Sequence, residues 1–458
     1  MITNRNVISV IDGAAGSCGK GKVIGEIATD KTINLGASVT NCMPNAGHTY
    51  VDEKGHALVF RNIPISIINP NTELFIGPGS AIDMEVFRKE YKKMKPLLNG
   101  RKIYVHEKVS LIEERHKQYE REHIRSGSTF KGCGAVTAEK VMRDPNLKYF
   151  QTYEDAVRCS AEEWRDKLRE HVGKTDQYVM LEGAQGCDLG LNHSGEGDNT
   201  TSRNVSTAQL QADSAISPLY ILQTIMVIRP FPIRISNSTD LGKTIYSGGY
   251  GTARELTWSE VNISSLLGWY PTKGFLYDFK KEYTTDTVAK YYEACPETYL
   301  EQVFGENYKN VDLNNATLEQ ALELERLVHK VDSEDCYESD FIELPLFNQT
   351  IYENGGAIID QSEQTTVTQR ERRIFDLDIK KLKNNCWDNT PSSLYLNFFQ
   401  HLDYSYKGKV ANFDEVDFDR PIIEYLNWLE SETDVDISML GTGARNGERI
   451  KRKELILR

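Results

Sequence analysis

Short runs of apolar and β-branched residues recur along this chain and stop at Gly or Pro, a pattern typical of buried parallel strands. We predict strands at residues 7–11, 178–186, 224–232 and 395–403, the first ending at Gly13 before a loop rich in glycine. A helix is predicted after that loop, at 22–29. The pattern predicts an α/β fold with a large, mostly parallel central sheet, flanking helices and inserted subdomains. Ligands of such sheets bind at the carboxyl ends of the strands.

Two further segments, 113–124 and 161–172, have helical spacing and many charges, so we interpret them as helices with solvated faces. Between residues 270 and 356 the composition shifts toward acidic and aromatic residues, with a predicted helix at 316–331. No catalytic motif occurs there, and we interpret this stretch as an inserted subdomain. The predicted organisation is a core at 1–269, an insert at 270–356 and a return to the core at 357–458.

Composition narrows the classes of partner that this protein can have. Its 458 residues are 39% hydrophobic and 26% charged, and no apolar run reaches the length that spans a bilayer. A net charge of −13 disfavours binding to DNA or RNA, which depends on neutralising many phosphates together. The eight cysteines form no C-x-x-C pair, which is typical of reduced thiols, and the first residues lead directly into a strand. We therefore expect a cytoplasmic protein without membrane or nucleic-acid partners, in which a local basic site holds any anionic ligand.

The loop after the first predicted strand, GSCGKGK at 16–22, has the spacing G-x-x-x-x-G-K of a phosphate-binding loop. Val23 stands where a Walker A loop carries the Ser or Thr that binds Mg²⁺, so the loop is related to the P-loop without matching it. Its glycines still let backbone N–H groups approach phosphate oxygens, and the following helix adds a favourable field. Downstream, the tight segment PNAGHT at 44–49 carries His48, although a lone histidine is more often structural than catalytic.

Seven stretches recur in the order in which they mark one enzyme family. They are GSCGKGK (16–22), NAGHT (45–49), GSTFKGCG (127–134), LEGAQG (181–186), TTSRN (200–204), TTVTQRERR (365–373) and LGTGARNGER (440–449). With these stretches the sequence resembles the adenylosuccinate synthetases over nearly its whole length apart from the insert. The resemblance implies a ligase that couples L-aspartate to C6 of a purine nucleoside monophosphate, driven by a nucleoside triphosphate and Mg²⁺. It implies two steps: the purine 6-oxygen attacks the γ-phosphate, and the aspartate amine then displaces the 6-phosphoryl group.

The resemblance also carries catalytic residues onto matching positions, namely Ser17, Lys20, His48 and Gln185. Lys20 would neutralise charge on the γ-phosphoryl group, and His48 would polarise or protonate the 6-oxygen region. Mg²⁺ would be bound by Ser17 and by the carbonyl of Gly47.

The remaining implied residues form three binding groups. The purine nucleotide would be held by Ser17, Asn45, Ser128, Thr129, Gln185 and Thr201, with Arg143 reaching its 5′-phosphate from the neighbouring subunit of a homodimer. ATP would contact Gly16, Cys18, Gly19, Lys20, Gly21, Lys22, Gly47, His48, Thr49, Gln400 and Gly443. The carboxylates of L-aspartate would be bound by Thr366, Thr368, Arg370 and Arg372, since guanidinium forks suit bidentate carboxylate recognition.

Two positions depart from the usual pattern of that family. Ser17 stands where the family has an aspartate that takes the N1 proton and binds Mg²⁺, and serine is a poor base at neutral pH. Gln400 stands where the family has an aspartate that accepts from guanine, whereas a neutral amide both donates and accepts. The amide at position 400 favours ATP or dATP over GTP. The loss of both aspartates resembles a viral branch of the family, the 2-aminoadenylosuccinate synthases, which carry serine at the loop position. Members of that branch join L-aspartate to dGMP with ATP, on the route to 2-aminoadenine in phage DNA.

The sequence therefore predicts an ATP-dependent ligase that acts on dGMP and releases ADP and phosphate, in the host cytoplasm if the protein is viral. Two alternatives stay open: an ordinary adenylosuccinate synthetase that uses IMP and GTP, and a catalytically silent nucleotide-binding protein. The acceptor of the N1 proton also stays open between Asp12 and the γ-phosphate. The sequence also leaves open whether the purine nucleotide is dGMP, GMP or IMP and whether the phosphoryl donor is ATP or dATP. The role of the insert stays open as well.

Overall fold

The computed structural model contains two compact units, one formed by residues 1–257 with 361–458 and the other by 258–360. The described residues are 4–124, 128–195, 197–240, 243–258, 261–262, 265, 300, 309, 351–353, 357–359, 361–363 and 371–456. The predicted helix at 316–331 and nearly all of the predicted insert lie outside the described residues. The boundaries 1–269, 270–356 and 357–458 therefore stay a prediction.

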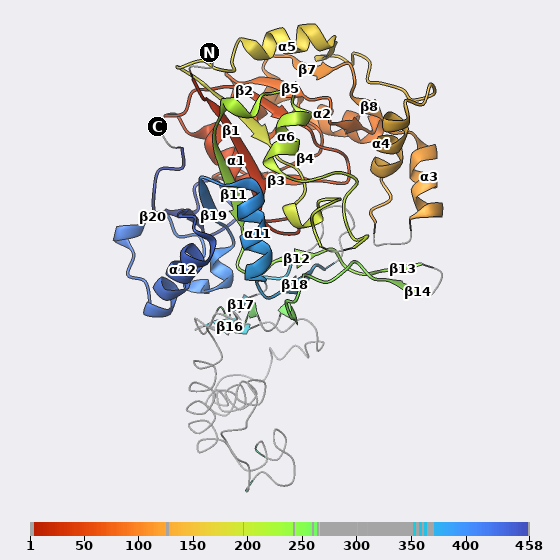
Figure 1. Ribbon diagram of the computed structural model, residues 1–458. Coiled ribbons are helices and arrows are strands. Elements are labelled where there is room, and N and C mark those ends of the chain that lie inside the picture. The colour runs from red at the N-terminus through yellow and green to blue at the C-terminus, as the bar shows by residue number, and fades with distance from the viewer. Residues whose placement is uncertain are drawn as a thin grey trace. The chain divides into compact units, whose positions relative to one another are not determined.

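A sheet of eleven strands forms the centre of the larger unit (Figure 1). Neighbouring strands follow the order β20-β22-β21-β19-β11-β1-β10-β2-β5-β7-β9, and all of these pairs are parallel except β21 with β22. Their bounds are β1 Val7–Asp12, β2 Leu35–Thr40, β5 Glu73–Ile76, β7 Ile103–His106, β9 Ala156–Cys159, β10 Tyr178–Glu182, β11 Ile221–Ile228, β19 Ser393–Leu396, β20 Ala411–Asn412, β21 Ile437–Gly441 and β22 Arg449–Lys451. The predicted α/β fold with a mostly parallel sheet is confirmed.

Shorter strands form separate small sheets in the described part of the chain. They are β3 His48–Val51 with β4 Ala57–Phe60, β6 Ala81–Ile82 with β8 Ser110–Leu111, β13 Ser238–Asp240 with β14 Lys243–Ile245, a three-stranded sheet of β12 Ile233–Arg234, β18 Arg373–Phe375 and β15 Glu255–Leu256, and, in the smaller unit, β16 Ile351–Glu353 with β17 Ala357–Ile359. The helices are α1 Lys20–Thr29, α2 Met84–Leu98, α3 Glu114–His123, α4 Cys133–Met142, α5 Ala161–Arg169, α6 Thr207–Asp213, α11 Ile379–Asn389 and α12 Arg420–Thr433. Short 3-10 helices are η1 Ile65–Ile68, η2 Cys187–Leu189, η3 Pro218–Tyr220, η6 Phe399–His401, η7 Tyr404–Tyr406 and η8 Phe413–Glu415.

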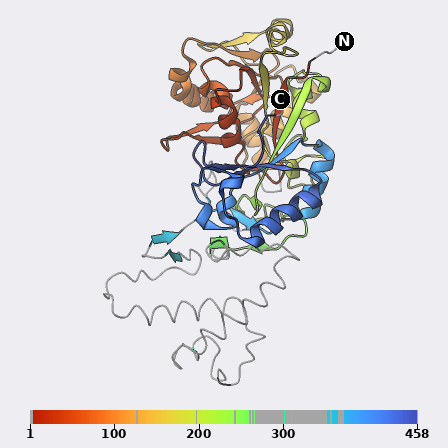
Figure 2. The ribbon, with the colours of Figure 1, turned by 90° about the vertical axis from the view of Figure 1, so that its left-hand side faces the viewer.

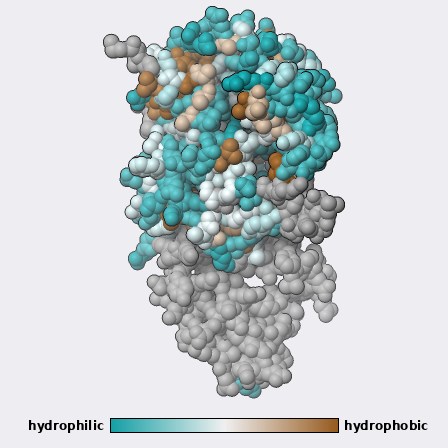
Figure 3. All heavy atoms as spheres, turned by 45° about the vertical axis from the view of Figure 1, so that its right-hand side comes forward, coloured by the Kyte–Doolittle hydropathy of each residue, from teal (hydrophilic) through white to brown (hydrophobic). Residues whose placement is uncertain are grey.

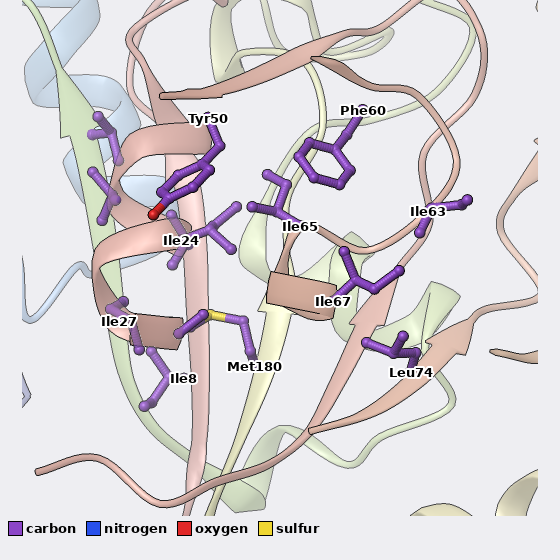
Figure 4. Packing of buried hydrophobic residues seen from close by; sticks show 14 of the residues in the cluster. Ile8, Ile24, Ile27, Tyr50, Phe60, Ile63, Ile65, Ile67, Leu74 and Met180 are labelled. Carbon is purple, nitrogen blue, oxygen red and sulfur yellow. The ribbon is translucent and has the colours of Figure 1, made fainter. Parts of the chain in front are cut away.

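The core behind the sheet is made by apolar residues of β1, the inner face of α1 and the short segments that cover them. Ile8 on β1 and Ile24 on α1 are fully buried, as expected for a parallel sheet covered by helices. Figure 4 shows Tyr50 of β3 beside Ile24 and Ile65, in the same cluster. The helix that follows the phosphate loop is therefore fixed to the sheet on one side and to β3 on the other.

The outer layer is mostly hydrophilic on the face shown in Figure 3, where hydrophobic side chains of the described residues form only small separate groups. Helices α11 and α12 pack against each other and appear in blue in Figures 1 and 2. Among the described residues, none of the helices combines the length and apolar character that crossing a bilayer requires.

The carboxyl ends of the central strands bring distant parts of the sequence together. After β1 comes the phosphate loop, after β2 the segment with Asn45, after β10 Gln185, after β11 Arg229, after β19 Gln400 and after β21 Gly443. Because parallel strands point the same way, these segments gather at one edge of the sheet, where ligands of such folds bind.

Candidate active site

The phosphate loop is wrapped around the carboxylate of Asp12, the last residue of β1. This carboxylate accepts hydrogen bonds from the backbone N–H groups of Ala14 (3.1 Å), Gly16 (3.2 Å) and Cys18 (3.0 Å). Gly16 and Ser17 have φ values of 91° and 59°, in the left-handed region that a side chain disfavours. The fully buried Asp12 thus sets the shape of a sharply bent loop.

Lys20, the first residue of α1, is buried beside Asp12. Its Nζ lies 2.9 Å from Asp12 Oδ2 and donates over 2.7 Å to the carbonyl oxygen of Gln185. Burial acts to raise the pKa of Asp12, but Lys20 and the loop N–H groups outweigh it, so the pKa lies below its usual value. An ionised carboxylate that accepts four hydrogen bonds suits loop support better than proton abstraction. The ammonium has three donors, which leaves one for a phosphate oxygen.

His48 begins β3 and is buried, with its Nε2 3.6 Å from Cys42 Sγ. Burial, followed by the charge of Lys20, lowers the pKa of His48 to about 3. The imidazole is therefore neutral at physiological pH and has one N–H to donate. Of the two roles predicted for His48, a neutral ring suits polarising an oxygen rather than protonating it.

The start of α1 also contacts β3 and the segment after β21. Nζ of Lys22 donates over 2.7 Å to the carbonyl of Gly443 and also to that of Glu448. Burial lowers the pKa of Lys22 to about 8. A Cβ at Gly21 would lie only 2.3 Å from the carbonyl oxygen of Thr49, so this approach requires glycine. Two pairs of residues predicted to bind ATP are thus direct neighbours.

The residues predicted to hold the purine nucleotide lie partly together. Asn45 Nδ2 and Thr201 Oγ1 are 3.4 Å apart. Gln185 has a left-handed φ of 66° and, through its carbonyl, contacts Lys20. At the next residue, Gly186, a Cβ would lie 2.1 Å from the Ala14 carbonyl, so the turn after β10 packs directly on the phosphate loop.

Three other predicted residues belong to the segment around α4. Ser128 Oγ accepts from the backbone N–H of Phe130 over 3.1 Å, with Thr129 between them. Arg143 ends α4 in a left-handed conformation with φ of 58° and is exposed. An exposed arginine at a helix end is free to reach another molecule, as its predicted role requires.

Ser17, a residue of the phosphate loop, contacts the segment predicted to bind L-aspartate. Its hydroxyl oxygen accepts from Nη1 of Arg372 over 2.5 Å, and its carbonyl accepts from Nη1 of Arg229 over 3.1 Å. The structure thus brings Ser17 and Arg372 together, as the prediction of one shared site requires. Thr366, Thr368 and Arg370 lie outside the described residues.

The strand predicted at 395–403 ends at Leu396, and that prediction is wrong beyond this residue. Phe398 adopts a left-handed φ of 58°, which ends the strand, and η6 follows. Asn397 Nδ2 donates over 3.1 Å to the carbonyl of Cys18, so the turn is attached to the phosphate loop. The side-chain oxygen of Gln400 is buried and accepts no hydrogen bond from the described residues. A free acceptor at this position suits an amino group of a nucleobase.

Sequence reasoning missed two charged residues of this site, Arg229 and Glu363. Arg229 is 1% exposed, and both of its Nη atoms contact the carboxylate of Glu363. A signal for Arg229 existed, because it interrupts the apolar run VIRPF at 227–231 directly after β11. Glu363 had none, since its acidic and polar surroundings resemble an exposed loop.

The predicted Mg²⁺ ligands are two neutral oxygens, the Ser17 hydroxyl and the Gly47 carbonyl. Among the described residues, no group of three or more His, Cys, Asp or Glu side chains could hold a metal ion. Ser17 Oγ already accepts from a guanidinium. Mg²⁺ commonly keeps waters and binds phosphate oxygens with few protein ligands. The donor set therefore fits an ion that arrives with a triphosphate rather than one held by the protein alone.

Comparison with known proteins identifies relatives of this chain. The family model described as adenylosuccinate synthetase matches residues 10–172. An N6-succino-2-amino-2′-deoxyadenylate synthase of Salmonella phage PMBT28 is 31% identical over 277 residues, which are 57% of this chain and 75% of that protein. Its namesake from Acinetobacter phage SH-Ab 15497 is 30% identical over 287 residues, covering 56% and 73%.

The fold has a solved counterpart in the succinoaminodeoxyadenylate synthetase of cyanophage S-2L, bound to dGMP and dATP as an energy donor. The TM-score is 0.65 at 20% identity, over 98% of this chain and 95% of that one. The family model and the two phage relatives confirm the family resemblance and the enzyme class predicted from the sequence. The chain belongs to the adenylosuccinate synthetase family, whose members are ligases that form a carbon–nitrogen bond.

Proposed function

We propose that this protein joins L-aspartate to C6 of dGMP, with ATP or dATP as the phosphoryl donor. The purine loses its N1 proton to an oxygen of the γ-phosphate, and the 6-oxygen attacks the γ-phosphorus, which releases the nucleoside diphosphate and leaves a 6-phosphoryl nucleotide. The aspartate amine then attacks C6, the C–O bond breaks, and inorganic phosphate leaves. The products are a 2-aminoadenylosuccinate-type nucleotide, ADP or dADP, and phosphate.

The observation that carries the proposal is the neutral Ser17, held by Arg372 at the turn of the phosphate loop. A small hydroxyl leaves more room beside a purine than a carboxylate and can accept from a 2-amino group. The free side-chain oxygen of Gln400 supports adenine as the base of the triphosphate. The names of the two phage relatives and the dGMP and dATP in the cyanophage structure agree with this choice.

The same proposal assigns the remaining groups. Lys20 binds the γ-phosphate with its free donor, and neutral His48 polarises the 6-oxygen. Arg372 binds a carboxylate of L-aspartate together with Thr366, Thr368 and Arg370. These side chains act by position and charge, the effects that dominate phosphoryl transfer.

Mg²⁺ is proposed to neutralise the triphosphate, with Ser17 and Gly47 beside it. Arg143 is proposed to reach the 5′-phosphate of the purine nucleotide that is bound to the partner subunit of a homodimer. The substrates are soluble metabolites, and the proposed compartment is the cytoplasm, that of the host if the protein is viral.

A substrate panel tests this function. Purified protein receives L-aspartate and Mg²⁺ with dGMP, GMP or IMP, each with ATP, dATP or GTP, and phosphate release is measured. We expect the highest turnover with dGMP and ATP or dATP. Turnover only with IMP and GTP would instead identify an ordinary adenylosuccinate synthetase. Tight nucleotide binding without any turnover would identify a silent binding protein.

A further inference from the structure

Two arginines and one glutamate form a charged cluster around Ser17, and the catalytic scheme above uses only one of them. Arg229 comes directly after β11 and its side chain has no exposed surface. Its Nη1 lies 3.3 Å from Glu363 Oε2, and its Nη2 contacts Glu363 Oε1. The same Nη1 donates to the Ser17 carbonyl. Arg229 thus joins Glu363 to the phosphate loop.

Glu363 also faces Arg372, from the other end of the segment predicted to bind L-aspartate. The Nε of Arg372 is 4.0 Å from Glu363 Oε2, and the Arg372 backbone N–H donates over 2.8 Å to the Glu363 carbonyl. Burial acts to raise the pKa of Glu363, but the two arginines outweigh it and lower it. An ionised carboxylate therefore holds two guanidinium groups that would otherwise repel each other.

In this cluster two arginines face one glutamate, and residue 17 itself is neutral. Arg372 is the member that touches the Ser17 hydroxyl. A carboxylate at position 17 would compete with a substrate carboxylate for this guanidinium. With serine there, Arg372 faces the carboxylate of Glu363, whose Oε2 lies 4.0 Å from its Nε.

We infer that Glu363 is a positioning residue that, with Arg229, holds the Arg372 guanidinium on Ser17 and keeps it available for the carboxylate of L-aspartate. This inference rests on the proposed function. Glu363 does not touch the substrates and acts only through the two arginines. Arg229 adds rigidity, because its guanidinium also stacks 4.1 Å from the centre of the Phe398 ring.

The variant Glu363→Gln tests the inference by removing the charge with little change of shape. We expect the KM for L-aspartate to rise about 10- to 100-fold, the effect of losing a charged hydrogen bond. The KM for ATP should rise less than the KM for L-aspartate, because neither Glu363 nor Arg372 is among the residues predicted to bind ATP. Glu363→Asp keeps the charge on a shorter side chain and should restore part of the affinity for L-aspartate. It also carries the test if the glutamine variant does not fold.

The matched control is Glu430→Gln, which breaks the pair of Glu430 with Arg452. That pair has exposed fractions of 19% and 16%, against 20% and 13% for Glu363 and Arg372, and no residue predicted for the site takes part in it. This control should leave the KM for L-aspartate unchanged. An equal rise in KM for every substrate, or an unchanged KM for L-aspartate in Glu363→Gln, would overturn the inference.

A second readout does not depend on turnover. Hydrogen exchange of the backbone amides at 14–20 should become faster in Glu363→Gln and stay unchanged in Glu430→Gln, because Ser17 loses its fixed partners. If the wild-type protein turns over no purine nucleotide, the proposed function fails and the exchange rates still decide the positioning role. If the wild type is active, and Glu363→Gln has the wild-type KM for L-aspartate and the wild-type exchange rates, only the positioning role is wrong and the proposed function stands.

Discussion

Residue 17 occupies a left-handed turn with φ of 59°, and its hydroxyl lies 2.5 Å from Nη1 of Arg372. In Ser17→Asp, a longer carboxylate would fill the space beside the purine and pair with this guanidinium. We expect kcat/KM for dGMP to fall about tenfold more than kcat/KM for IMP, the effect of crowding one group of a ligand. Steady-state rates with both nucleotides measure this difference. Ser17→Ala, which adds no bulk, should affect the two nucleotides alike, and equal effects of Ser17→Asp would show that residue 17 does not read the 2-amino group.

Single residues also show what the sequence could predict of the site. The loop, Lys20 and Gln185 follow from local motifs, and the structure brings them into contact. The carboxylate of Asp12 accepts hydrogen bonds from the N–H groups of the loop, and this role could not be predicted. The side-chain direction at the end of a fully buried strand depends on the turn that follows. Glu363 could not be found either, since its partner Arg229 is 134 residues away in sequence.

At the scale of elements, periodicity predicted what lies within an element better than where it ends. The helices expected at 113–124 and 161–172 correspond to α3 and α5. The helix expected at 22–29 begins two residues earlier, because Gly19 with φ of 87° forms its N-cap. The apolar residues Phe398 and Phe399 favour one continuous strand at 395–403, yet Phe399 packs on Tyr406 with ring centres 5.2 Å apart. The apolar residues after Leu396 therefore pack within a turn and do not extend the strand.

The contact between α1 and β3 can be tested at Gly25, which is outside the predicted site. A Cβ there would lie 2.2 Å from Cδ2 of Tyr50, a ring that is 5% exposed and cannot move aside freely. Overpacking costs about 1–3 kcal/mol and the better helix propensity of alanine returns about 1 kcal/mol, so Gly25→Ala should lower the unfolding free energy by about 1 kcal/mol. Urea unfolding measures this loss.

Activity should fall in the same variant, because β3 carries His48. Gly249→Ala is the control, since no atom of the described residues lies within 4 Å of its added Cβ. A Gly25→Ala protein as stable as the wild type would mean that α1 and β3 adjust to each other without cost.

At the scale of the whole molecule, the protein takes its chemistry from charges buried at one edge of a large sheet, while its surface carries the excess of acid. A net charge of −13 repels phosphates at long range, so binding of anionic substrates depends on a few buried cations. Lys20, Lys22 and Arg229 are each less than 5% exposed. Salt screens the electrostatic interactions of such buried groups less than it screens those of surface charges. Burial of this kind also makes the fold sensitive to pH.

Three buried histidines contribute to that sensitivity in the same direction. Burial lowers the pKa of His106 to about 4 and that of His401 to about 3, against 6.5 in an unfolded chain. Between these values the unfolded state binds protons that the native state does not, so stability decreases as pH falls from about 6.5 to 4. Glu90 acts in the opposite sense, because burial raises its pKa to about 7 and the native state keeps a proton that the unfolded state loses above 4.5. Glu182, Asp188 and His171 act in the same sense as Glu90, because their pKa values are also raised. His48 acts with the other two histidines, and carboxyls of lowered pKa such as Asp12 and Glu363 also lose their contribution as pH falls. We expect this second set of groups to dominate, so that the net effect is loss of stability in acid.

Urea unfolding between pH 7 and pH 4 measures this loss, and His106→Gln should reduce its slope. Nδ1 of His106 accepts from the Lys108 backbone N–H over 3.0 Å, a contact that a glutamine side-chain oxygen can replace. The unfolding free energy of the variant should therefore match that of the wild type at pH 7. The slope of unfolding free energy against pH should fall by the equivalent of about one proton, because glutamine does not titrate. His106 is the last residue of β7 and contacts Trp164 of α5. Three strands separate β7 from β1 and its phosphate loop, so catalytic rates at pH 7 should not change. An unchanged slope in His106→Gln would mean that other groups, such as the ion pairs of Asp12 and Glu363, control the acid response, since carboxyls with lowered pKa lose their contribution as pH falls.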